Sequence, residues 1–327
     1  MSTKMSSKKR IESVNDFVIK FANVNGTGSA SANNLFAKAL FRMGLPVCPK
    51  NIFPSNIQGL PTWYEVRVSE KGYLGRRGGV DIVLSVNPQS MPQDIQDVEP
   101  GGYFIYDNTK PLDLRLIRND VHIIGIPLTR ICNEQYQDHR QRQLFKNVIY
   151  LGALAALLDM DFKVLSNLVE DQFKGKEKLV LPNIHALELG HQWARANLEC
   201  PIGIRVRTSD KVGDKILLDG NTALGLGAIY GGATVAAWYP ITPSTSVVDA
   251  FEKYAKRVRI DPGTGRRNYA IVQAEDELSA IGMVIGAGWN GSRSFTATSG
   301  PGVSLMSEFL GLAYFAEIPT VLFNVQR

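Results

Sequence analysis

The sequence predicts two α/β domains, the second built on a parallel, doubly wound sheet. The chain has 327 residues, which suggests about two domains at roughly 100–200 residues each. Hydrophobic residues make up 44% and charged residues 20% of the chain, which suits a large core and excludes wholesale disorder. In the second half, strand-like apolar runs alternate with helical stretches of roughly 13 residues, a pattern typical of parallel sheets.

The first domain is predicted at residues 15–199, after a disordered, solvated tail at residues 1–14. It opens with an apolar strand at 17–22, a glycine turn at Gly26–Thr27–Gly28 and a helix over 30–42. A strand, a glycine turn and a helix in this order open nucleotide-type α/β units. The remaining predicted elements are strands at 63–68, 80–86, 103–106 and 121–126, and helices at 135–158, 162–171 and 183–198, the last with Asn183 as its cap.

Residues 200–215 lack helical periodicity and contain Pro, Gly and charges, so they are predicted to be a linker. The second domain follows at 216–327. Its predicted elements are a helix at 223–230 that starts at Asn221 or Thr222, a strand at 233–238, a helix to 257, a strand at 269–273, a helix at 276–289, a strand at 294–298, a helix to 316 and a strand at 320–325. Because a buried strand is a poor terminus for a parallel sheet, we expect the chain to be a C-terminally truncated fragment of a longer polypeptide.

Charge and cysteine content restrict the class of protein. The net charge of +5 permits an anionic ligand, but the scattered charges form no nucleic-acid-binding arm. The three cysteines are far apart and form no CxxC motif, so we expect no zinc or iron–sulfur site held by this chain alone and a reducing, cytoplasmic location. The longest apolar run, 151–158, is too short to cross a membrane, and no signal peptide is recognisable.

Three small-residue loops follow successive strands of the second domain and should converge at the carboxyl edge of its sheet, where ligands of such folds bind. In the loop 239–244, Thr242 suits a helix cap and Pro243 the first helical position, or the stiff turn preorganises a hydroxyl and amides for a small acid. Glu275 either complements a helix dipole or points into a crevice with a raised pKa, where it could share a proton with a ring nitrogen. The loop 298–302 is a plain turn or a third ligand-binding segment.

The turn Gly26–Thr27–Gly28 could hold a phosphate, because glycine lets backbone amides approach and a helix N-terminus favours anions. A tight turn without a ligand is the alternative. Ser31 stands at the third glycine position of G-x-G-x-x-G, and no acidic residue follows at the spacing expected for a ribose contact. An NAD-dependent dehydrogenase is therefore not favoured.

Four segments of the second half together resemble the α subunit of 2-oxoacid:ferredoxin oxidoreductases. They are YPITPS at 239–244, QAE at 273–275, TSGPG at 298–302 and NVQR at 324–327. The first half resembles the γ domain that is fused ahead of α in this family. The segments SNIQGL at 55–60 and PTWYEVRVS at 61–69 resemble its 2-oxoglutarate-type branch.

The resemblance implies thiamine-diphosphate-dependent oxidative decarboxylation of a 2-oxoacid, 2-oxoglutarate in this branch. Coenzyme A is the co-substrate, acyl-CoA (succinyl-CoA) and CO2 are the products, and ferredoxin accepts the electrons. The second domain would be a pyrimidine-type thiamine diphosphate domain. A β subunit would share the thiamine diphosphate and hold Mg2+ and a [4Fe–4S] cluster in an (αβ)2 assembly. The chain alone would be inactive.

The resemblance also assigns site residues. Glu275 matches the catalytic glutamate that hydrogen-bonds the aminopyrimidine ring of thiamine diphosphate, with Ile241 and Pro243 beside the cofactor. Thr242, Ser299 and Arg327 would bind the 2-oxoacid, since an Arg suits a carboxylate. The first domain would bind coenzyme A. Its expected contacts are Gly26, Thr27, Gly28, Ser29, Asn33 and Arg67, with Arg76 or Arg77 as further phosphate contacts.

Two other interpretations remain open at this point. One is a coenzyme A or nucleotide-binding module without a redox role, based on the loop 26–29. The other is a catalytically inert subunit that kept a thiamine-type fold. Glu275 favours the enzyme subunit over the inert one, because a degenerate relative has no reason to keep a carboxylate there.

Overall fold

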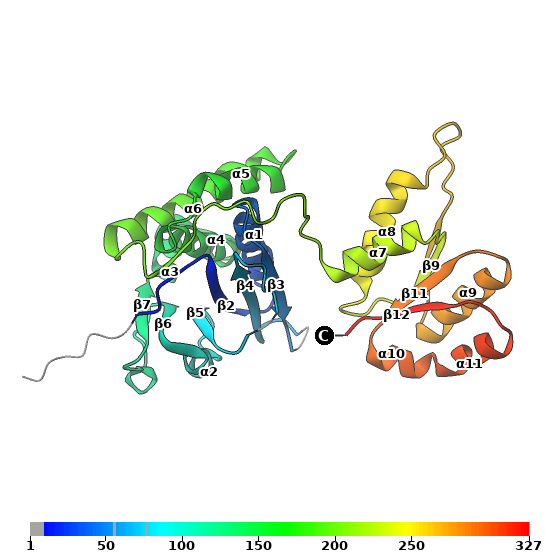
Figure 1. Ribbon diagram of the computed structural model, residues 1–327, viewed down its shortest axis with the longest axis horizontal. Coiled ribbons are helices and arrows are strands. Elements are labelled where there is room, and N and C mark those ends of the chain that lie inside the picture. The colour runs from blue at the N-terminus through cyan, green and yellow to red at the C-terminus, as the bar shows by residue number, and fades with distance from the viewer. Residues whose placement is uncertain (1–9, 55–56, 76, 327) are drawn as a thin grey trace, which may run out of the picture. The chain divides into compact units, whose positions relative to one another are not determined.

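The computed structural model describes residues 10–54, 57–75 and 77–326. The chain divides into two compact units, residues 1–216 and 217–327 (Figure 1). Each unit is an α/β structure with its own sheet. The first sheet is mixed and the second is parallel, as described below for each unit in turn.

Unit 1 contains a six-stranded sheet in the order β3-β4-β2-β5-β6-β7. Only β4 runs antiparallel to its neighbours, while β2, β5, β6 and β7 pair in parallel. The strands are β2 (Asp16–Val24), β3 (Val47–Ile52), β4 (Pro61–Ser69), β5 (Val80–Ser85), β6 (Val98–Asp107) and β7 (His122–Ile126). Strand β3 was not predicted from the sequence, where Pro49 and polar residues hide its pattern.

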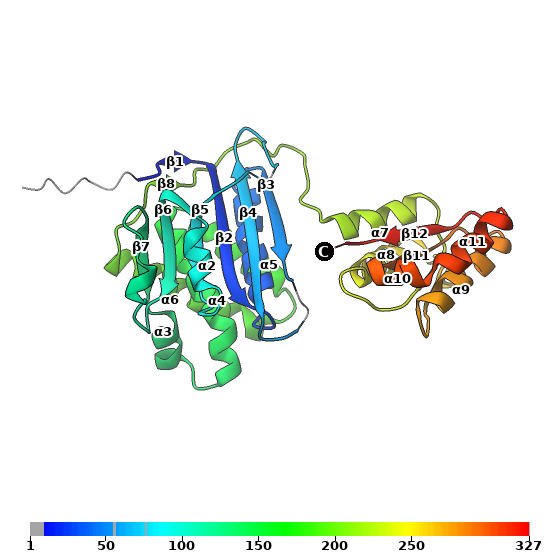
Figure 2. The same cartoon turned by 90° about the horizontal axis from the view of Figure 1, so that it is seen from below.

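Helices cover both faces of this sheet (Figure 2). On one face, Phe21 of β2 packs with Phe36 of α1 and Tyr150 of α4, at ring-centroid distances of 5.4 and 5.9 Å. On the other face, Ile95 of α2 packs with Val83 and neighbouring apolar residues. The helices are α1 (Ser29–Arg42), α2 (Met91–Gln96), η1 (Leu114–Leu116), α3 (Leu128–Gln135), α4 (His139–Leu157), α5 (Phe162–Gln172) and α6 (Glu177–Asn197).

Two predicted helices of unit 1 need correction. The helix predicted over 135–158 is α4, which begins at His139 because the Asp138 side chain caps it by accepting from the Gln141 amide at 2.8 Å, while the preceding helix α3 was not predicted. Helix α6 begins at Glu177 and not at Asn183, so Asn183 is not a cap. The Asn183 side chain donates instead to the Leu179 carbonyl at 2.7 Å, one turn earlier in the same helix. Pro182 lies inside α6, where sequence rules favour a break.

The expected linker at 200–215 lies against unit 1. Strand β8 (Ile204–Arg205) pairs in parallel with β1 (Ser13–Val14), and Ile202 and Val206 are buried. The Ile202 and Val206 amides donate to the carbonyls at the end of α4, at 2.9 and 2.8 Å. The same pairing orders residues 10–14 of the expected tail, and residues 1–9 lie outside the described residues. Backbone hydrogen bonds between the two segments explain why neither is a free linker or tail.

Unit 2 contains a four-stranded parallel sheet in the order β10-β9-β11-β12, which confirms the predicted doubly wound domain. Phe251 of α8 packs on one face and Ile281 of α9 belongs to the core on the other. The elements are α7 (Gly220–Tyr230), β9 (Val235–Trp238), α8 (Thr245–Val258), β10 (Ala270–Gln273), α9 (Glu277–Trp289), β11 (Ser294–Thr298), α10 (Gly300–Leu305), α11 (Ser307–Phe315) and β12 (Val321–Asn324).

Two predicted helices of unit 2 also differ. The cap of α7 is Asp219, whose carboxylate accepts from the Thr222 amide at 2.9 Å, and not Asn221 or Thr222. The helix predicted to run to residue 316 is broken at Met306 into α10 and α11. In the described part of the chain, no helix is both long and apolar enough to cross a membrane.

Candidate functional site

Strand register brings two of the expected loops of unit 2 together. Gln273 of β10 lies opposite Trp238 of β9, and the Ala274 amide donates to the Trp238 carbonyl at 2.8 Å. The loop 239–244 and Glu275 therefore leave the sheet side by side. Strand β11 is the other neighbour of β9 and ends at Thr298. All three expected loops thus lie at one carboxyl edge.

The loop 239–244 is held by hydrogen bonds to its own backbone and to α7. Ser244, and not Thr242, occupies the cap position of α8, which corrects the predicted cap and leaves Pro243 outside the helix. The Ser244 hydroxyl is buried and donates to the Ile241 carbonyl at 2.9 Å. The Asn221 side chain donates to the Pro243 carbonyl at 3.0 Å. The turn therefore keeps Thr242 exposed at the edge of the sheet.

Glu275 is exposed in this chain, which corrects the expectation of an enclosed crevice. The reason is its place after β10, the outer strand of the four-stranded sheet. The role of complementing the helix falls to Asp276, which caps α9 by accepting from the Ser279 amide at 2.6 Å. Hydrogen bonds from Ser279 hold the pKa of Asp276 below its usual value. Glu275 therefore does not cap α9, and its exposed carboxylate is accessible to a ligand or a partner chain.

The loop 298–302 is the most enclosed of the three. Thr298 is fully buried and Ser299 is 8% exposed. Ser299 precedes α10 without capping it through its side chain. A Cβ on Gly302 would collide with the Thr298 hydroxyl, so this position requires glycine. The Val325 amide donates to the Thr298 carbonyl at 2.9 Å, while Arg327 lies outside the described residues.

In unit 1, the loop 25–29 follows β2 and leads into α1. Gly26 and Gly28 have φ angles of +86° and +78°, a conformation that favours glycine. Helix α1 lies on one face of the sheet and α2 on the other, and the chain turns in opposite directions after β2 and after β5. The loop therefore lies at a topological switch point, where α/β folds bind ligands.

Buried amides support this loop from below. The Asn33 side chain donates to Asn23 Oδ1 at 3.0 Å and accepts from the Tyr150 hydroxyl at 2.7 Å. The Asn147 side chain of α4 donates to the Thr27 carbonyl at 2.8 Å. Asn33, expected to contact a ligand, is thus committed to the core, while Gly26, Thr27 and Gly28 form the turn itself.

Arg67 is not near that loop. It lies on β4 opposite Val18, close to the start of β2, whereas the loop follows the end of β2, roughly 20 Å further along the strand. Arg67 is buried, pairs with Asp16 at 2.5 Å and donates to the Phe17 carbonyl at 3.2 Å. The ion pair and the strand register keep this guanidinium from the expected coenzyme A loop.

The comparisons with known proteins cover both units. Residues 18–193, more than half of the chain, match the family model described as pyruvate ferredoxin/flavodoxin oxidoreductase. Residues 226–327 match the model described as pyruvate flavodoxin/ferredoxin oxidoreductase, thiamine diP-bdg. The chain belongs to the 2-oxoacid:ferredoxin oxidoreductase family.

Relatives of this oxidoreductase chain are α subunits. It is 30% identical to subunit alpha of 2-oxoacid:ferredoxin oxidoreductase 2 from Aeropyrum pernix, covering 94% of this chain and 54% of the relative. It is 44% identical over 114 residues to 2-oxoglutarate synthase subunit KorA from Methanothermobacter thermautotrophicus, covering 35% of this chain and 28% of the relative. The chain spans about half the length of the curated relatives that it matches along most of its sequence.

A solved structure shares the fold of this family member. It is the 2-oxoglutarate:ferredoxin oxidoreductase from Magnetococcus marinus with 2-oxoglutarate, coenzyme A and succinyl-CoA bound. The identity is 32% and the TM-score 0.81, over 96% of this chain and 52% of that one. The match supports the α/β fold described above for both units.

Sequence patterns missed one cation of this oxidoreductase chain, at the carboxyl edge of the unit 1 sheet where β6 ends. Lys146 precedes Asn147 on α4, donates to the Thr129 hydroxyl at 2.6 Å and lies 3.5 Å from Asp107. Burial acts to raise the pKa of Asp107, but hydrogen bonds from Thr129 and Thr109 with the nearby Lys146 ammonium hold it below its usual value. A lysine among the polar residues in the first half of α4 gives no signal of this position.

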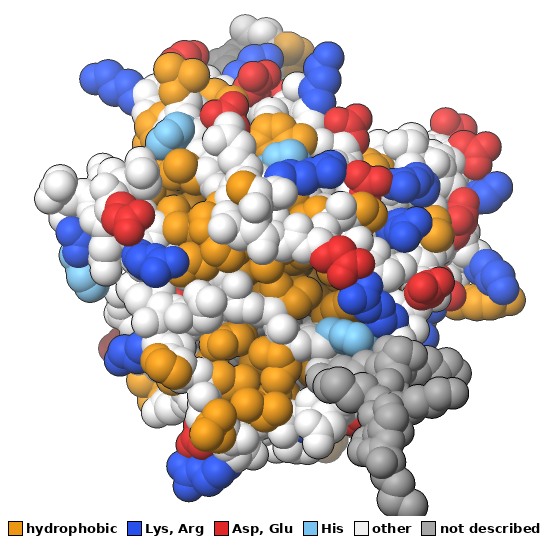
Figure 3. All heavy atoms as spheres, turned by 90° about the vertical axis from the view of Figure 1, so that its left-hand side faces the viewer, with side chains coloured by type: hydrophobic (Ala, Val, Ile, Leu, Met, Phe, Trp, Pro, Cys, Tyr) orange, Lys and Arg blue, Asp and Glu red, His pale blue; other side chains and the backbone are white. Residues whose placement is uncertain are grey.

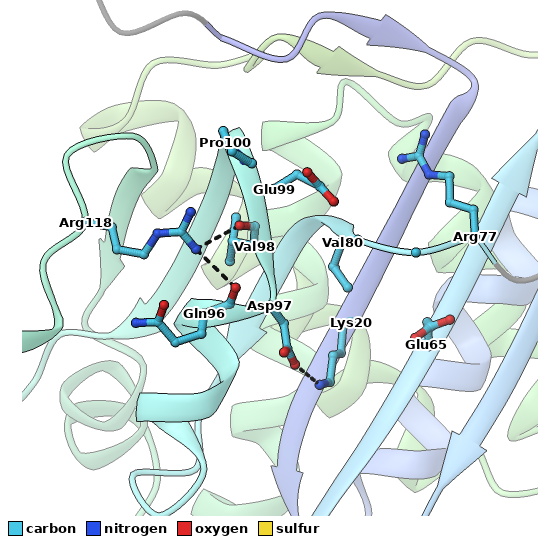
Figure 4. A pocket seen from close by; sticks show the side chains of 12 residues that line it. Lys20, Glu65, Arg77, Val80, Gln96, Asp97, Val98, Glu99, Pro100 and Arg118 are labelled. Atoms are coloured by element: carbon cyan, nitrogen blue, oxygen red, sulfur yellow. Dashed lines mark hydrogen bonds and ion pairs between the residues drawn. The ribbon is translucent and has the colours of Figure 1, made fainter.

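A polar cavity of about 660 Å³ lies elsewhere in unit 1 (Figure 4). It reaches Val80 and Val98, the first residues of β5 and β6, and so lies at the opposite end of these strands from the glycine loop. Figure 4 shows Lys20 pointing to Asp97, at 2.5 Å, and Arg118 bound to backbone carbonyls. Arg77 pairs with Asp81, and Arg76 lies outside the described residues. The side chains of Lys20, Arg77 and Arg118 are therefore already bonded to other groups of unit 1.

Charges are dispersed elsewhere too. On the face in Figure 3, basic and acidic side chains alternate around apolar areas, in keeping with the net charge of +5. Within the described ranges, no group of three or more His, Cys, Asp or Glu side chains is placed to hold a metal ion.

Proposed function

We propose that this chain supplies the coenzyme A-side domain and half of the thiamine diphosphate site of a 2-oxoglutarate:ferredoxin oxidoreductase. The observation that carries the proposal is the convergence of Thr242, Glu275 and Ser299 at one carboxyl edge of a thiamine-type domain. In this proposal the first unit is a γ-type domain fused ahead of α. A β subunit completes the site in an (αβ)2 assembly in the cytoplasm and holds Mg2+ and a [4Fe–4S] cluster.

The proposed reaction converts a 2-oxoacid and coenzyme A to acyl-CoA, CO2, one proton and two electrons. The bond between the carboxyl carbon and the oxo carbon breaks, and a thioester bond forms between the acyl carbon and the sulfur of coenzyme A. Ferredoxin takes the two electrons. The relative from Magnetococcus marinus, described with 2-oxoglutarate, coenzyme A and succinyl-CoA bound, supports 2-oxoglutarate as the substrate.

The described residues fit a thiamine ring at this edge. Glu275 is exposed beside the turn that contains Ile241 and Pro243, so its carboxyl can hold a proton against a ring nitrogen presented from the partner side. The buried Thr298 hydroxyl at the same edge lacks a partner within the described chain. When bound, thiamine diphosphate supplies the electron sink for decarboxylation. Thr242 and Ser299 line the 2-oxoacid side, and Arg327 is proposed to hold a carboxylate.

Coenzyme A is proposed to bind at the switch point of unit 1. Gly26, Thr27, Gly28 and Ser29 place a turn at the N-terminus of α1, where backbone amides favour phosphate. Lys146 lies at the same carboxyl edge, at the end of β6, where it is bonded to Thr129 and Asp107. Asn33 and Arg67 are not proposed to contact coenzyme A. The Asn33 side chain is hydrogen-bonded beneath the loop, and Arg67 lies near the opposite end of β2.

The test is an acceptor assay on the chain co-purified with its β subunit. Wild-type complex should reduce a dye with 2-oxoglutarate only when coenzyme A is present. Glu275→Ala should lower turnover at least about 100-fold, because removal of a proton-holding group costs this much in general acid–base sites. Assembly, measured by size-exclusion chromatography, should be unchanged.

Glu308→Gln is the matched control, because Glu308 is an exposed carboxylate in the first turn of another helix of unit 2. It should leave turnover at the wild-type value. Equal turnover of Glu275→Ala and wild type would remove Glu275 from the mechanism. A complex that turns over no 2-oxoacid would favour the inert thiamine-fold subunit instead.

A further inference from the structure

The peptide group that joins Thr27 to Gly28 is bonded to a side chain of α4. Asn147 of this helix is 3% exposed, and its side-chain amide donates to the Thr27 carbonyl at 2.8 Å. The Thr27 hydroxyl is bonded separately, because it donates to the Val24 carbonyl at 2.8 Å. Asn147 lies 120 residues further along the chain, so this contact joins the glycine loop to a distant segment of unit 1.

The same contact sets the direction of the Gly28 amide. A peptide group is planar and almost always trans, so its carbonyl and its N–H point in opposite directions. The Thr27 carbonyl points to the buried Asn147 side chain, and the Gly28 N–H therefore points away from it. Among the described residues, this N–H has no hydrogen-bond acceptor. No side chain caps α1, which begins at the next residue, so the first amides of the helix also lack an acceptor within the helix.

Glycine makes this peptide easy to turn over. Gly28 has a φ angle of +78°, and glycine populates positive and negative φ about equally. Turning the peptide over would exchange the positions of the Thr27 carbonyl and the Gly28 N–H. Glycine is nevertheless required, because a Cβ on Gly28 would lie 2.7 Å from Leu144 Cδ2 of α4. The turn therefore needs its most flexible residue where the direction of the amide matters, and Asn147 supplies the restraint.

We propose that Asn147 is a positioning residue for coenzyme A. It holds the peptide between Thr27 and Gly28 in the orientation that offers the Gly28 N–H to the diphosphate of coenzyme A. The inference rests on the proposed function, which assigns coenzyme A to this turn. A bond from an N–H to an ionised phosphate is stronger than one between neutral groups, whereas a peptide turned over would set a carbonyl oxygen against the phosphate.

Two variants of Asn147 test the role in the complex with the β subunit. Asn147→Ala removes the restraint, and the KM for coenzyme A should rise about tenfold, the effect of one lost hydrogen bond to a charged group. Asn147→Asp is nearly isosteric, but its carboxylate accepts the Gly28 N–H and favours the peptide turned over. Its KM for coenzyme A should rise at least as much. In both variants, kcat and the KM for 2-oxoglutarate should stay within about twofold of wild type.

Inhibition by the two halves of coenzyme A locates the effect. The fragment 3′-phospho-ADP carries the diphosphate, and pantetheine carries the thiol. In Asn147→Ala, the inhibition constant of 3′-phospho-ADP should rise by the same factor as the KM for coenzyme A, and that of pantetheine should stay at the wild-type value. Weaker inhibition by both fragments would indicate a general loosening of unit 1 and would contradict the proposal.

Tyr103→Phe is the control for lost stability. Tyr103 is 2% exposed, and its hydroxyl accepts from the Gly203 amide at 3.0 Å. It lies opposite His122, the first residue of β7, and so away from the carboxyl edge. This variant should unfold at a lower temperature than wild type with an unchanged KM for coenzyme A.

The outcomes separate the inference from the proposed function. Thermal unfolding checks that each variant folds. An Asn147→Ala or Asn147→Asp complex with the wild-type KM for coenzyme A, or a rise that Tyr103→Phe matches, would overturn the positioning role while the proposed function stands. A wild-type complex whose turnover of 2-oxoglutarate does not depend on coenzyme A would overturn the proposed function, and this inference with it.

Discussion

The two carboxyl edges of this protein satisfy their buried polar groups differently. In unit 1, Asn33 bonds Asn23 and Tyr150, and Asn147 bonds the backbone of the glycine loop. In unit 2, the Thr298 hydroxyl is buried with no partner in the described chain. In unit 1 the bonded amides support the loop, and Asn23 Nδ2 is left without a partner among the described residues, whereas in unit 2 the Thr298 hydroxyl makes no hydrogen bond within the described chain.

This difference indicates two ways of building a site. A loop held from below by bonded amides, here those of Asn33 and Asn147, is preorganised, so that a ligand finds its backbone amides already in place. An edge with unpaired buried groups lowers the stability of the free chain, and that cost is recovered only when the site is complete. Removing a single hydroxyl group in each unit tests whether the two sites are built in these two ways.

The largest effect is expected for Tyr150→Phe in unit 1. The Tyr150 hydroxyl donates to Asn33 Oδ1 at 2.7 Å inside the core, and burial raises the pKa of this phenol. Loss of the donor leaves the side-chain oxygen of Asn33 without this hydrogen bond, so the free energy of unfolding should fall by about 1–3 kcal/mol. Denaturant unfolding of the complex measures it, and weaker coenzyme A binding should accompany it.

Tyr64→Phe is the control for this variant. Tyr64 is also buried, but its hydroxyl makes only a long 3.4 Å bond to Asn34. Its unfolding free energy should change less than that of Tyr150→Phe. Equal losses in the two variants would contradict a supporting role for the amide cluster beneath the loop.

A smaller effect of opposite sign is expected for Thr296→Val in unit 2. The Thr296 hydroxyl is fully buried and has no partner among the described residues. Valine keeps the shape and removes the unsatisfied group, so unfolding free energy should rise by roughly 1 kcal/mol. A loss of stability on thermal unfolding would show that the hydroxyl is already bonded, and the contrast between the two edges would weaken.

The smallest effect is expected for Asp276→Asn, and it depends on pH. Hydrogen bonds from Ser279 lower the pKa of Asp276 in the folded chain, so the ionised carboxylate stabilises the cap above the usual carboxyl pKa of about 4. The wild-type chain should melt slightly above the variant at neutral pH. The gap should close as the pH falls through the lowered folded-state pKa. A gap that widens in acid would contradict the assigned direction.

Much of the fold follows from local patterns. The strand–helix alternation predicted the parallel sheet of unit 2, and β11 matches its expected bounds. Capping was harder to predict, because several residues near a helix start can cap it. The path of the turn places Ser244, rather than Thr242, at the cap position of α8. Asn183 was misassigned because Pro182 suggests a break that the packed helix α6 does not have.

The sequence by itself determined that there are two α/β units and that Thr242, Glu275 and Ser299 follow successive strands. These features depend on neighbours in the chain, through hydrophobic period and turn residues. Only the tertiary structure decided that Glu275 is exposed, that Arg67 lies far from the glycine loop and that the Thr298 hydroxyl is buried without a partner among the described residues. Exposure, separation and pairing depend on strand order and register, which arise from contacts between segments distant in the chain.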